Sequence, residues 1–493
     1  MNNPDEATAV EQFGRGDKYF GVAVMLVTLP GLPMFGHGQV EGFAEKYGME
    51  YRRAYWDETV DEGFVAHHDT QVFPLLHQRY LFSEAELFEL YPFEGEQGSN
   101  DDVFAYSNGS GQQRALVVYH NRQGEASGWI RHSVPKTRSG ADDGCQPSTT
   151  TLAAALGANS GNCYYRFRDQ HSGQHYLRSG AELNEQGLFF QLGSYQYQVF
   201  VDFCELIDTD GSWGRLCQQL GGRPVSDLDR ELKRLHFESL LSAFDQLLQQ
   251  PLQTELIPQR FTEEVPTGPD KLETKPLLAA FEAFIRQLQP LAAPQGDSTE
   301  LVAGLTSELQ ALQDLSSPLA SKPDQPKVRS ELHQILTGPL SRVLPIYLLL
   351  HRLGDLLPDD GSPARTIVWL DDYLLQDSLA RMLNNGDQLL LIALIRWQDP
   401  LPKENHLATL LDDETVRACL HVHDYEDHQW LCGERLAELA LGLFAISALA
   451  AAADQESGTA LDLRLEQLWQ QAQQMIALGE QAGYRLDRLQ TSR

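Results

Sequence analysis

The chain has 493 residues, enough for about three domains at roughly 100–200 residues each. Hydrophobic residues make up 42% of it and charged residues 22%, which is typical of a globular protein and argues against global disorder. The formal charge is -31 at pH 7, so the chain repels phosphate backbones and anionic lipids. We therefore expect neither nucleic acid nor a membrane among its partners.

The cysteines and the apolar segments favour a cytoplasmic protein. The six cysteines form no Cys-x-x-Cys pair and are too few for a disulfide framework in so long a chain. No charged segment followed by an apolar one opens the sequence, so it predicts no signal peptide. The longest apolar run, Leu439 to Ala453, is shorter than the ~20 residues of a membrane span and predicts a buried helix.

Residues 1–92 predict a helix, a strand, a long loop and a second helix, in the order of an α/β repeat. The first helix is expected from Lys18 to Leu29, with Asp17 as its cap. The short apolar run from Leu32 to Phe35 predicts a buried strand that enters a glycine-rich loop. Helical spacing returns between Val72 and Phe82.

Residues 93–210 predict an all-β domain, closed as an antiparallel β-sandwich. Two runs, Val103–Tyr106 and Ala115–Tyr119, flank turn residues and indicate a hairpin. Tyr195–Cys204 alternates as a strand with one solvent-facing side does. From residue 211 to the end, leucines at spacings of three and four predict a mostly α-helical region, 211–493.

Three motifs follow one another near the N-terminus. They are Asn2-Asn3-Pro4-Asp5-Glu6, then Leu29-Pro30-Gly31-Leu32-Pro33-Met34-Phe35-Gly36-His37-Gly38-Gln39, then Arg53 to Asp57. This order resembles the C-terminal end of the catalytic barrel in the α-amylase family of glycoside hydrolases. There, an Asn-His-Asp motif ends the seventh strand, and a Pro-Gly-x-Pro strand leading into Gly-x-Gly-Gln forms the eighth. A β-sandwich follows that barrel, so the resemblance covers roughly residues 2 to 207.

The resemblance implies roles for individual residues. Asp5 falls on the third catalytic carboxylate of the family, which stabilises an oxocarbenium-like transition state. Pro4 stands where the family usually has a histidine that hydrogen-bonds the sugar, and proline has no donor side chain. Val40 separates Gln39 from Glu41, where the family often has adjacent Gln and Glu. The residues expected to contact sugar are Asn3, His37, Gln39, Arg53 and Trp56.

The nucleophile and the acid/base are not recognisable in this sequence. A retaining glycosidase needs two such carboxyl groups about 5–5.5 Å apart. In the family they come from strands that precede the Asn-His-Asp motif, where this sequence has only Met1. Asp371-Asp372, after the run Ile367 to Leu370, is the best strand-end acid pair downstream, but its context does not match. A closed barrel takes typically ~250 residues, so we expect a C-terminal fragment that is inactive alone.

The expected fold class is multidomain α+β: an incomplete (β/α) barrel remnant, an antiparallel β-sandwich and a mostly α-helical region. The expected function is that of an α-amylase-like enzyme that hydrolyses or transfers glycosyl units of α-glucans or maltooligosaccharides, without a cofactor or a metal. The N-terminal part of the same enzyme is an expected partner. The alternative is a non-catalytic accessory module that binds glucan or docks a protein.

Three further groups have two interpretations each. His421, His423, Asp424, His428 and Cys432 suggest metal ligands, although a polar helix surface explains them more simply. The triplet His67-His68-Asp69 predicts an exposed turn and helix cap, with substrate contact as the alternative. The rings of Tyr51, Tyr55 and Trp56 could stack on sugars or pack the loop against the barrel.

Overall fold

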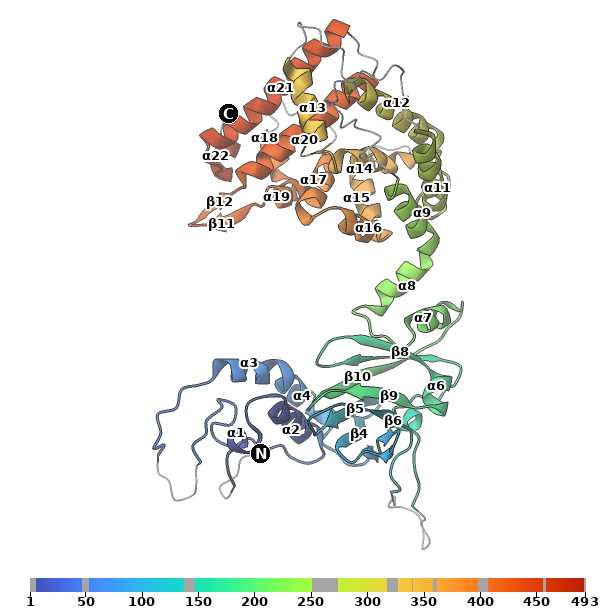
Figure 1. Ribbon diagram of the computed structural model, residues 1–493, viewed down its shortest axis with the longest axis vertical. Helices are drawn as coiled ribbons and strands as arrows, with labels where there is room; N and C mark the ends of the chain where they lie inside the picture. Colours follow the sequence, from blue (N-terminus) through green and yellow to red (C-terminus); the bar gives the residue numbers. More distant parts are fainter. Residues whose placement is uncertain are drawn as a thin grey trace. The chain divides into compact units, whose positions relative to one another are not determined.

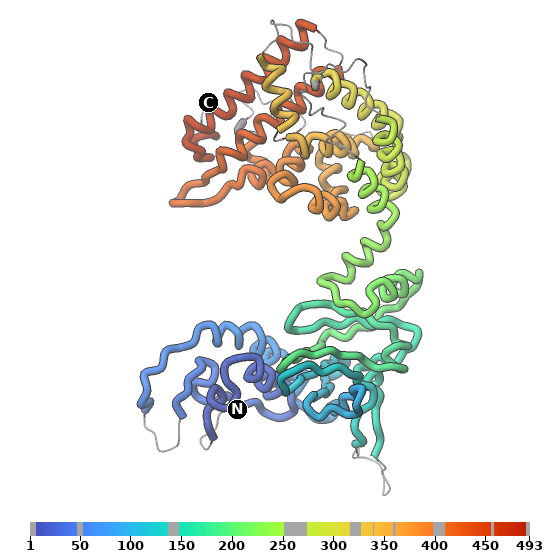
Figure 2. The backbone as a smooth tube through the Cα atoms, in the orientation of Figure 1, coloured from blue at the N-terminus to red at the C-terminus, as the bar shows by residue number. Residues whose placement is uncertain are grey.

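The computed structural model describes residues 6–46, 53–136, 147–250, 274–316, 327–338, 340–357, 361–397, 407–454 and 458–491. These residues form a mixed α+β protein with antiparallel sheets, and no closed barrel occurs among them. The chain divides into two compact units, residues 1–236 and 237–493 (Figure 1). Figure 2 follows the backbone through each unit.

The first unit begins with short helices. They are α1 (Ala9–Phe13), α2 (Asp17–Thr28), α3 (Glu62–Gln71), α4 (Phe73–His77) and the 3-10 helix η1 (Arg79–Leu81). Helix α2 matches the first predicted helix, but Gly16 is its cap and Asp17 lies in its first turn. The second predicted helix is broken into α4 and η1.

The predicted strand from Leu32 to Phe35 is wrong. The segment is irregular, and the side chains of Leu32 and Met34 are 85% and 68% exposed. A strand needs a neighbour to satisfy its backbone hydrogen bonds. No described strand pairs with this segment, so its apolar side chains lie in solvent.

Two antiparallel sheets follow. The larger has the order β1-β4-β5-β10-β7-β8 and the smaller β3-β2-β6-β9. Their strands are β1 (Glu89–Tyr91), β2 (Glu94–Gly95), β3 (Gly98–Ser99), β4 (Val103–Ser110), β5 (Gln113–His120), β6 (Ala126–Ile130), β7 (Tyr164–Asp169), β8 (His175–Ser179), β9 (Leu188–Leu192) and β10 (Tyr197–Leu206). The remaining helices of this unit are α5 (Leu152–Ala155), α6 (Gly180–Glu185), α7 (Ser212–Leu220) and α8 (Leu228–His236). The predicted hairpin is present as β4–β5, in which Ser110 pairs with Gln113.

The larger sheet is buried on both faces. Phe200 of β10 packs with Phe167 and Phe190 in a core to which both sheets contribute. Its neighbours Val199 and Val201 belong to a second core, in which helix α2 covers the opposite face. The expectation of one solvent-facing side is therefore wrong for β10, because a helical layer covers the face that alternation alone assigns to water.

The second unit is helical, as predicted. Its elements are α9 (Glu238–Leu248), α11 (Thr274–Ala292), α12 (Thr299–Ser316), α13 (Lys327–Thr337), α14 (Val343–Leu350), η2 (Leu353–Leu356), α15 (Ser362–Asp372), α16 (Leu375–Met382), α17 (Asn385–Arg396), α18 (Leu407–Asp412), α19 (Glu414–Cys419), β11 (His423–Tyr425), β12 (His428–Trp430), α20 (Gly433–Ala453), α21 (Gly458–Gln481) and α22 (Leu486–Thr491). Leucine side chains dominate its single large core.

Helix α20 runs through this core and packs against α12, α17 and α21. The prediction of a buried helix from Leu439 to Ala453 is confirmed. Among the described helices, α20 alone has the length and apolar composition to cross a membrane, and most of its apolar stretch is buried in the unit.

Candidate functional site

Four of the predicted sugar-binding residues, His37, Gln39, Arg53 and Trp56, lie on the long connection between α2 and α3. Asp5 and Asn3 fall outside the described residues, so their predicted roles have no geometry here. His37, Arg53 and Trp56 are exposed, whereas Gln39 is completely buried. Of the predicted sugar-binding residues that the structure describes, three are therefore at the surface and one, Gln39, is in the interior.

A closed turn holds Gln39 inside. The backbone N–H of Gln39 donates to the Gly36 carbonyl oxygen at 3.1 Å, and the Gly36 N–H donates to Gln39 Oε1 at 3.1 Å. Gly38 has φ +69°, and a Cβ there would lie 2.7 Å from Phe43. Glycine is thus required at this position for both backbone and space. The Gln39 side chain stabilises the turn that presents His37.

A buried polar cluster lies beneath this turn. The Tyr19 hydroxyl donates to the Gln39 carbonyl oxygen at 3.2 Å and lies 3.0 Å from His68 Nε2, while His68 Nδ1 is 2.9 Å from the Phe64 carbonyl oxygen. Burial raises the pKa of Tyr19 to about 12, and a hydrogen bond with the Gln39 side chain partly offsets this. Burial also lowers the pKa of His68, which favours the neutral ring.

The expectation that His67-His68-Asp69 forms an exposed turn is therefore wrong. All three residues lie within α3, and His68 is completely buried. Its partner Tyr19 is 49 residues away in the chain, which no local pattern reveals.

Two exposed aromatic side chains are presented by a loop with a fixed backbone. The side chains of Tyr55 and Trp56 are 67% and 59% exposed. Their backbone N–H groups donate to the two carboxylate oxygens of Glu45 at 2.8 and 3.1 Å. Glu58 in turn accepts the N–H groups of Ala44 and Glu45 at 2.7 and 2.9 Å. We call residues 53–58 with Glu45 the aromatic loop.

Arg15 ties the same connection to α3. Its guanidinium donates to Asp61 Oδ2 at 3.0 Å and to the Gly42 carbonyl oxygen at 2.6 Å. Asp61 also caps α3 by accepting the Phe64 N–H at 3.1 Å. The positions of the glycine-rich turn and the aromatic loop therefore follow from hydrogen bonds to backbone groups.

The other predicted acids and ligands do not form sites. Asp371 and Asp372 end the helix α15, so the interpretation as a strand-end pair is wrong. His423 and His428 lie on the exposed hairpin β11–β12, where a polar helix surface was expected. No group of three His, Cys, Asp or Glu side chains able to hold a metal ion occurs in the described part of the chain.

A hollow of about 470 Å³ lies in the β region of the first unit. Trp129 and Phe189 pair across β6 and β9 with ring centroids 5.2 Å apart, and Phe189 is 46% exposed. Arg131 lies over the Trp129 ring at 5.1 Å. Arg178 also lines this hollow; it donates to the Gly222 carbonyl oxygen at 3.0 Å, and burial lowers its pKa. We call this site the aromatic hollow.

The chain matches no model of a known protein family, and no curated protein matches it by sequence. A functional proposal for this chain therefore rests on the chemistry of the residues described above. Glu45 and Glu58, which set the aromatic loop, escape sequence reasoning because an isolated acid gives no signal. Trp129 and Phe189 were also missed, because their strands do not alternate apolar and polar residues in sequence.

Proposed function

We propose that this chain acts on α-linked glucans as part of an α-amylase-like glycoside hydrolase or glycosyltransferring enzyme. In this proposal Asp5 is the transition-state-stabilising carboxylate, and residues 2–92 form the end of a (β/α) barrel. The aromatic loop and His37 contact the sugar. The nucleophile and the acid/base come from another polypeptide segment, because in the α-amylase family they precede the Asn-His-Asp motif.

The aromatic loop is the observation that carries this proposal. A sugar ring presents a flat face of C–H groups, and an aromatic ring offers an apolar plate with a fixed shape. Tyr55 and Trp56 are neighbours in sequence and both are exposed, so their rings are accessible to a ligand. Because Glu45 already orders the backbone of Tyr55 and Trp56, a sugar would bind with little additional ordering cost.

The segment from Leu32 to Gly36 gives further support. Its side chains Leu32 and Met34 are apolar and exposed, and although the segment is irregular here, no described strand lies beside it to cover them. In the proposed enzyme, strands of the other polypeptide segment would pair with this one and cover both residues. The same pairing would bring the missing carboxyl groups to the end of the barrel that carries Asp5.

Affinity electrophoresis in gels that contain soluble starch tests the glucan contact. Trp56→Ala should weaken retardation about tenfold, which corresponds to about 1.4 kcal/mol of binding free energy. Tyr55→Ala should weaken it less, because its ring is smaller. Tyr425→Ala is the matched control, since Tyr425 is a similarly exposed ring, 59% exposed, that belongs to the second unit and not to the aromatic loop. Equal retardation of the parent chain and Trp56→Ala would contradict the proposal.

Turnover tests the assignment of the two missing carboxyl groups. The purified chain should release no new reducing ends from maltoheptaose, although it binds the oligosaccharide. Sustained turnover by the purified chain would show that a complete catalytic set lies within it and would overturn this part of the proposal.

The aromatic hollow favours a second candidate, a non-catalytic glucan-binding module. It has the size of a small-ligand site and combines apolar rings with Arg178 and Gln198. Trp129→Ala separates the two candidates in the starch gels. Loss of retardation in Trp129→Ala but not in Trp56→Ala would favour the accessory module over the catalytic assignment.

A further inference from the structure

The aromatic hollow contains a guanidinium group without an acid beside it. Arg178 of β8 lines the hollow and is partly buried. It forms no ion pair with any acid in the described part of the chain, and Glu182 acts on it only from a distance. Removing a charge from water without giving it a partner costs free energy. An anion that enters the hollow therefore gains binding free energy from Arg178.

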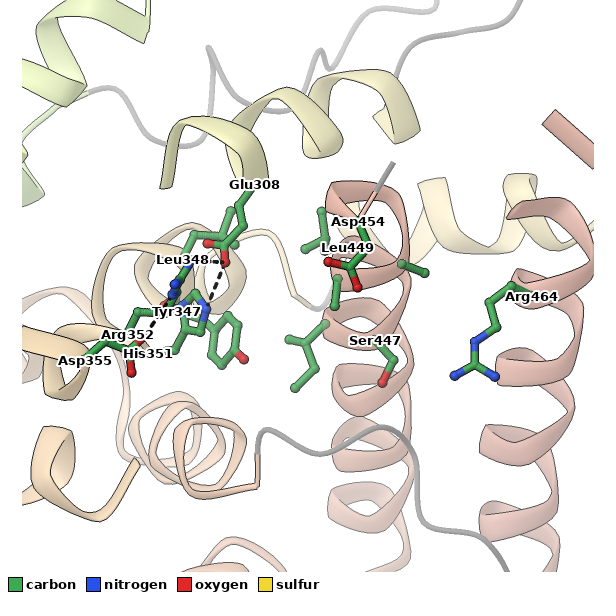
Figure 3. A pocket seen from close by; sticks show the side chains of 13 residues that line it. Glu308, Tyr347, Leu348, His351, Arg352, Asp355, Ser447, Leu449, Asp454 and Arg464 are labelled. Atoms are coloured by element: carbon green, nitrogen blue, oxygen red, sulfur yellow. Dashed lines mark hydrogen bonds and ion pairs between the residues drawn. The ribbon is translucent and has the colours of Figure 1, made fainter. Parts of the chain in front are cut away.

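A pocket of about 390 Å³ in the second unit shows the opposite arrangement (Figure 3). There, Arg352 Nε lies 2.9 Å from Asp355 Oδ2, and Arg352 Nη1 lies 3.8 Å from Glu308 Oε1. Carboxylates of the chain itself therefore balance this guanidinium. Arg178 has no such neighbour among the described residues, so the opposite charge can come from a ligand.

Arg178 is held in place and still has N–H groups to donate. Its Nη1 donates to the Leu177 carbonyl oxygen at 2.9 Å, and its Nη2 donates to the Gly222 carbonyl oxygen at 3.0 Å. The other N–H groups of the guanidinium remain for a ligand. Arg178 Nε makes no hydrogen bond with a described residue, and it is not one of the unpaired side-chain nitrogens that the protein covers completely. A ligand can therefore reach this atom.

An aromatic ring lies beside the guanidinium on the same strand. Residues two apart on a strand project to the same face of the sheet, and the Arg178 guanidinium carbon lies 5.7 Å from the centre of the Tyr176 ring. Tyr176 is partly exposed, lines the hollow, and stacks on Phe167 with the ring centroids 5.4 Å apart. One small molecule can thus place an acid group at Arg178 and a flat ring against Tyr176.

The charged residues of the lining indicate the charge of the ligand. Among the described residues that line the hollow, Arg178 and Arg223 are positive and only Glu182 is negative. The whole chain has a formal charge of -31, so this positive excess is local. A carboxylate carries one negative charge, which balances the excess, and it matches the planar guanidinium. A phosphate monoester carries about 1.5 to 2 negative charges at pH 7, more than the lining balances.

We propose that the aromatic hollow binds a small carboxylic acid with a flat ring, either an aromatic acid or a sugar acid. The carboxylate accepts hydrogen bonds from Arg178, and the ring lies against the exposed part of Tyr176. The volume of the hollow falls in the range of small-ligand sites. This inference is independent of the glucan contact at the aromatic loop. It also differs from the second candidate above, because a neutral glucan would leave Arg178 without an opposite charge.

Isothermal titration calorimetry of the full chain tests the proposal with matched pairs of probes. Phenylacetate and D-glucuronate carry the carboxylate, whereas phenylacetamide and D-glucose are their neutral counterparts. At least one acid should bind about tenfold or more tightly than its counterpart. A preference for phenylacetate identifies an aromatic acid, and a preference for D-glucuronate identifies a sugar acid. The proposal is overturned if neither acid binds or if the neutral counterparts bind as tightly.

Two charge variants and a control locate the binding. Arg178→Gln should reduce the affinity for the acid about tenfold and leave that for its neutral counterpart unchanged, a result that general unfolding would not produce. Arg223→Gln should reduce it about threefold, because Arg223 is exposed and water screens its charge. Arg215→Gln is the control, since Arg215 is exposed on α7 and does not line the hollow.

The exposed variant keeps the test decisive if Arg178→Gln fails to fold. In that case Arg223→Gln should still weaken the acid more than Arg215→Gln does, and added salt should weaken the acid but not its neutral counterpart. An unchanged affinity in folded Arg178→Gln, or equal effects of Arg223→Gln and Arg215→Gln, would contradict the assignment.

Discussion

Two carboxylates, Glu45 in the first unit and Glu308 in the second, differ in how many of their oxygens accept hydrogen bonds. In the first unit, both oxygens of the buried Glu45 carboxylate accept backbone N–H groups, and the buried Ser107 hydroxyl lies 2.7 Å from the Tyr91 hydroxyl. In the second unit, Glu308 Oε2 and Ser447 Oγ are buried without a described partner. The contrast teaches that a carboxylate whose two oxygens both accept backbone N–H groups fixes a loop, whereas one with an unpaired buried oxygen carries a free-energy cost.

The largest expected effect tests the aromatic core of the first unit. Phe200→Ala should lower the free energy of unfolding by about 3–5 kcal/mol, because Phe200 is 2% exposed and contacts Phe167, Tyr176 and Phe190. Urea denaturation followed by near-ultraviolet circular dichroism measures it. Phe189→Ala, at a side chain 46% exposed, should cost far less. Equal losses would show that the sheets do not share the core described.

The second prediction concerns the Glu45 carboxylate, whose two oxygens both accept backbone N–H groups. Glu45→Gln replaces one acceptor oxygen with a donor that faces a backbone N–H, so we expect a loss of about 1.5–3 kcal/mol in unfolding free energy. Faster amide hydrogen exchange at Tyr55 and Trp56 should accompany it. Asp57→Asn, at an exposed position of the same loop, is the control. If amide hydrogen exchange at Tyr55 and Trp56 is unchanged in Glu45→Gln, the Glu45 carboxylate does not hold this loop in place.

The third effect compares two buried serines. Ser107→Ala leaves the buried Tyr91 hydroxyl unpaired and should cost about 1–3 kcal/mol. Ser447→Ala removes a hydroxyl without a described partner and should leave stability unchanged or slightly raised. Thermal unfolding of both variants measures the difference. If the two substitutions cost the same, the distinction between a paired and an unpaired buried hydroxyl fails.

The smallest effect concerns pH. Burial lowers the pKa of His68 below its ordinary value of 6.5, although its hydrogen bond to the Phe64 carbonyl opposes the shift. The unfolded chain therefore binds this proton more readily than the folded chain, and stability should fall as the pH drops through about 6.5. His68→Gln should flatten that dependence, whereas His77→Gln, at an exposed site, should not. If the stability of His68→Gln and His77→Gln depends on pH in the same way, a group other than His68 causes the pH dependence.

Sequence patterns predicted the elements that local spacing determines. Helix α2, the β4–β5 hairpin and the helical second unit follow from apolar periodicity and turn residues. The segment at Leu32 was mispredicted because a strand depends on neighbours that spacing does not show. The two-sided burial of β10 was missed because it depends on α2, which lies far away in sequence.

The candidate site was predictable in part. Tyr55 and Trp56 were singled out by residue type and motif context, but the sequence left open whether their rings stack on sugars or pack the loop against the barrel. Glu45 was not, because its role depends on two N–H groups ten and eleven residues away. His68 was misjudged because its burial depends on Tyr19. The roles of Asn3 and Asp5 remain predictions from the resemblance.

Fluorine NMR of the chain labelled with 5-fluorotryptophan tests the glucan proposal most directly. The Trp56 resonance is identified by its absence in Trp56→Ala. Titration with maltoheptaose should shift that resonance in a saturable way, and the β-linked cellohexaose should not. A Trp56 resonance that stays in place at saturating maltoheptaose would contradict glucan recognition by the aromatic loop.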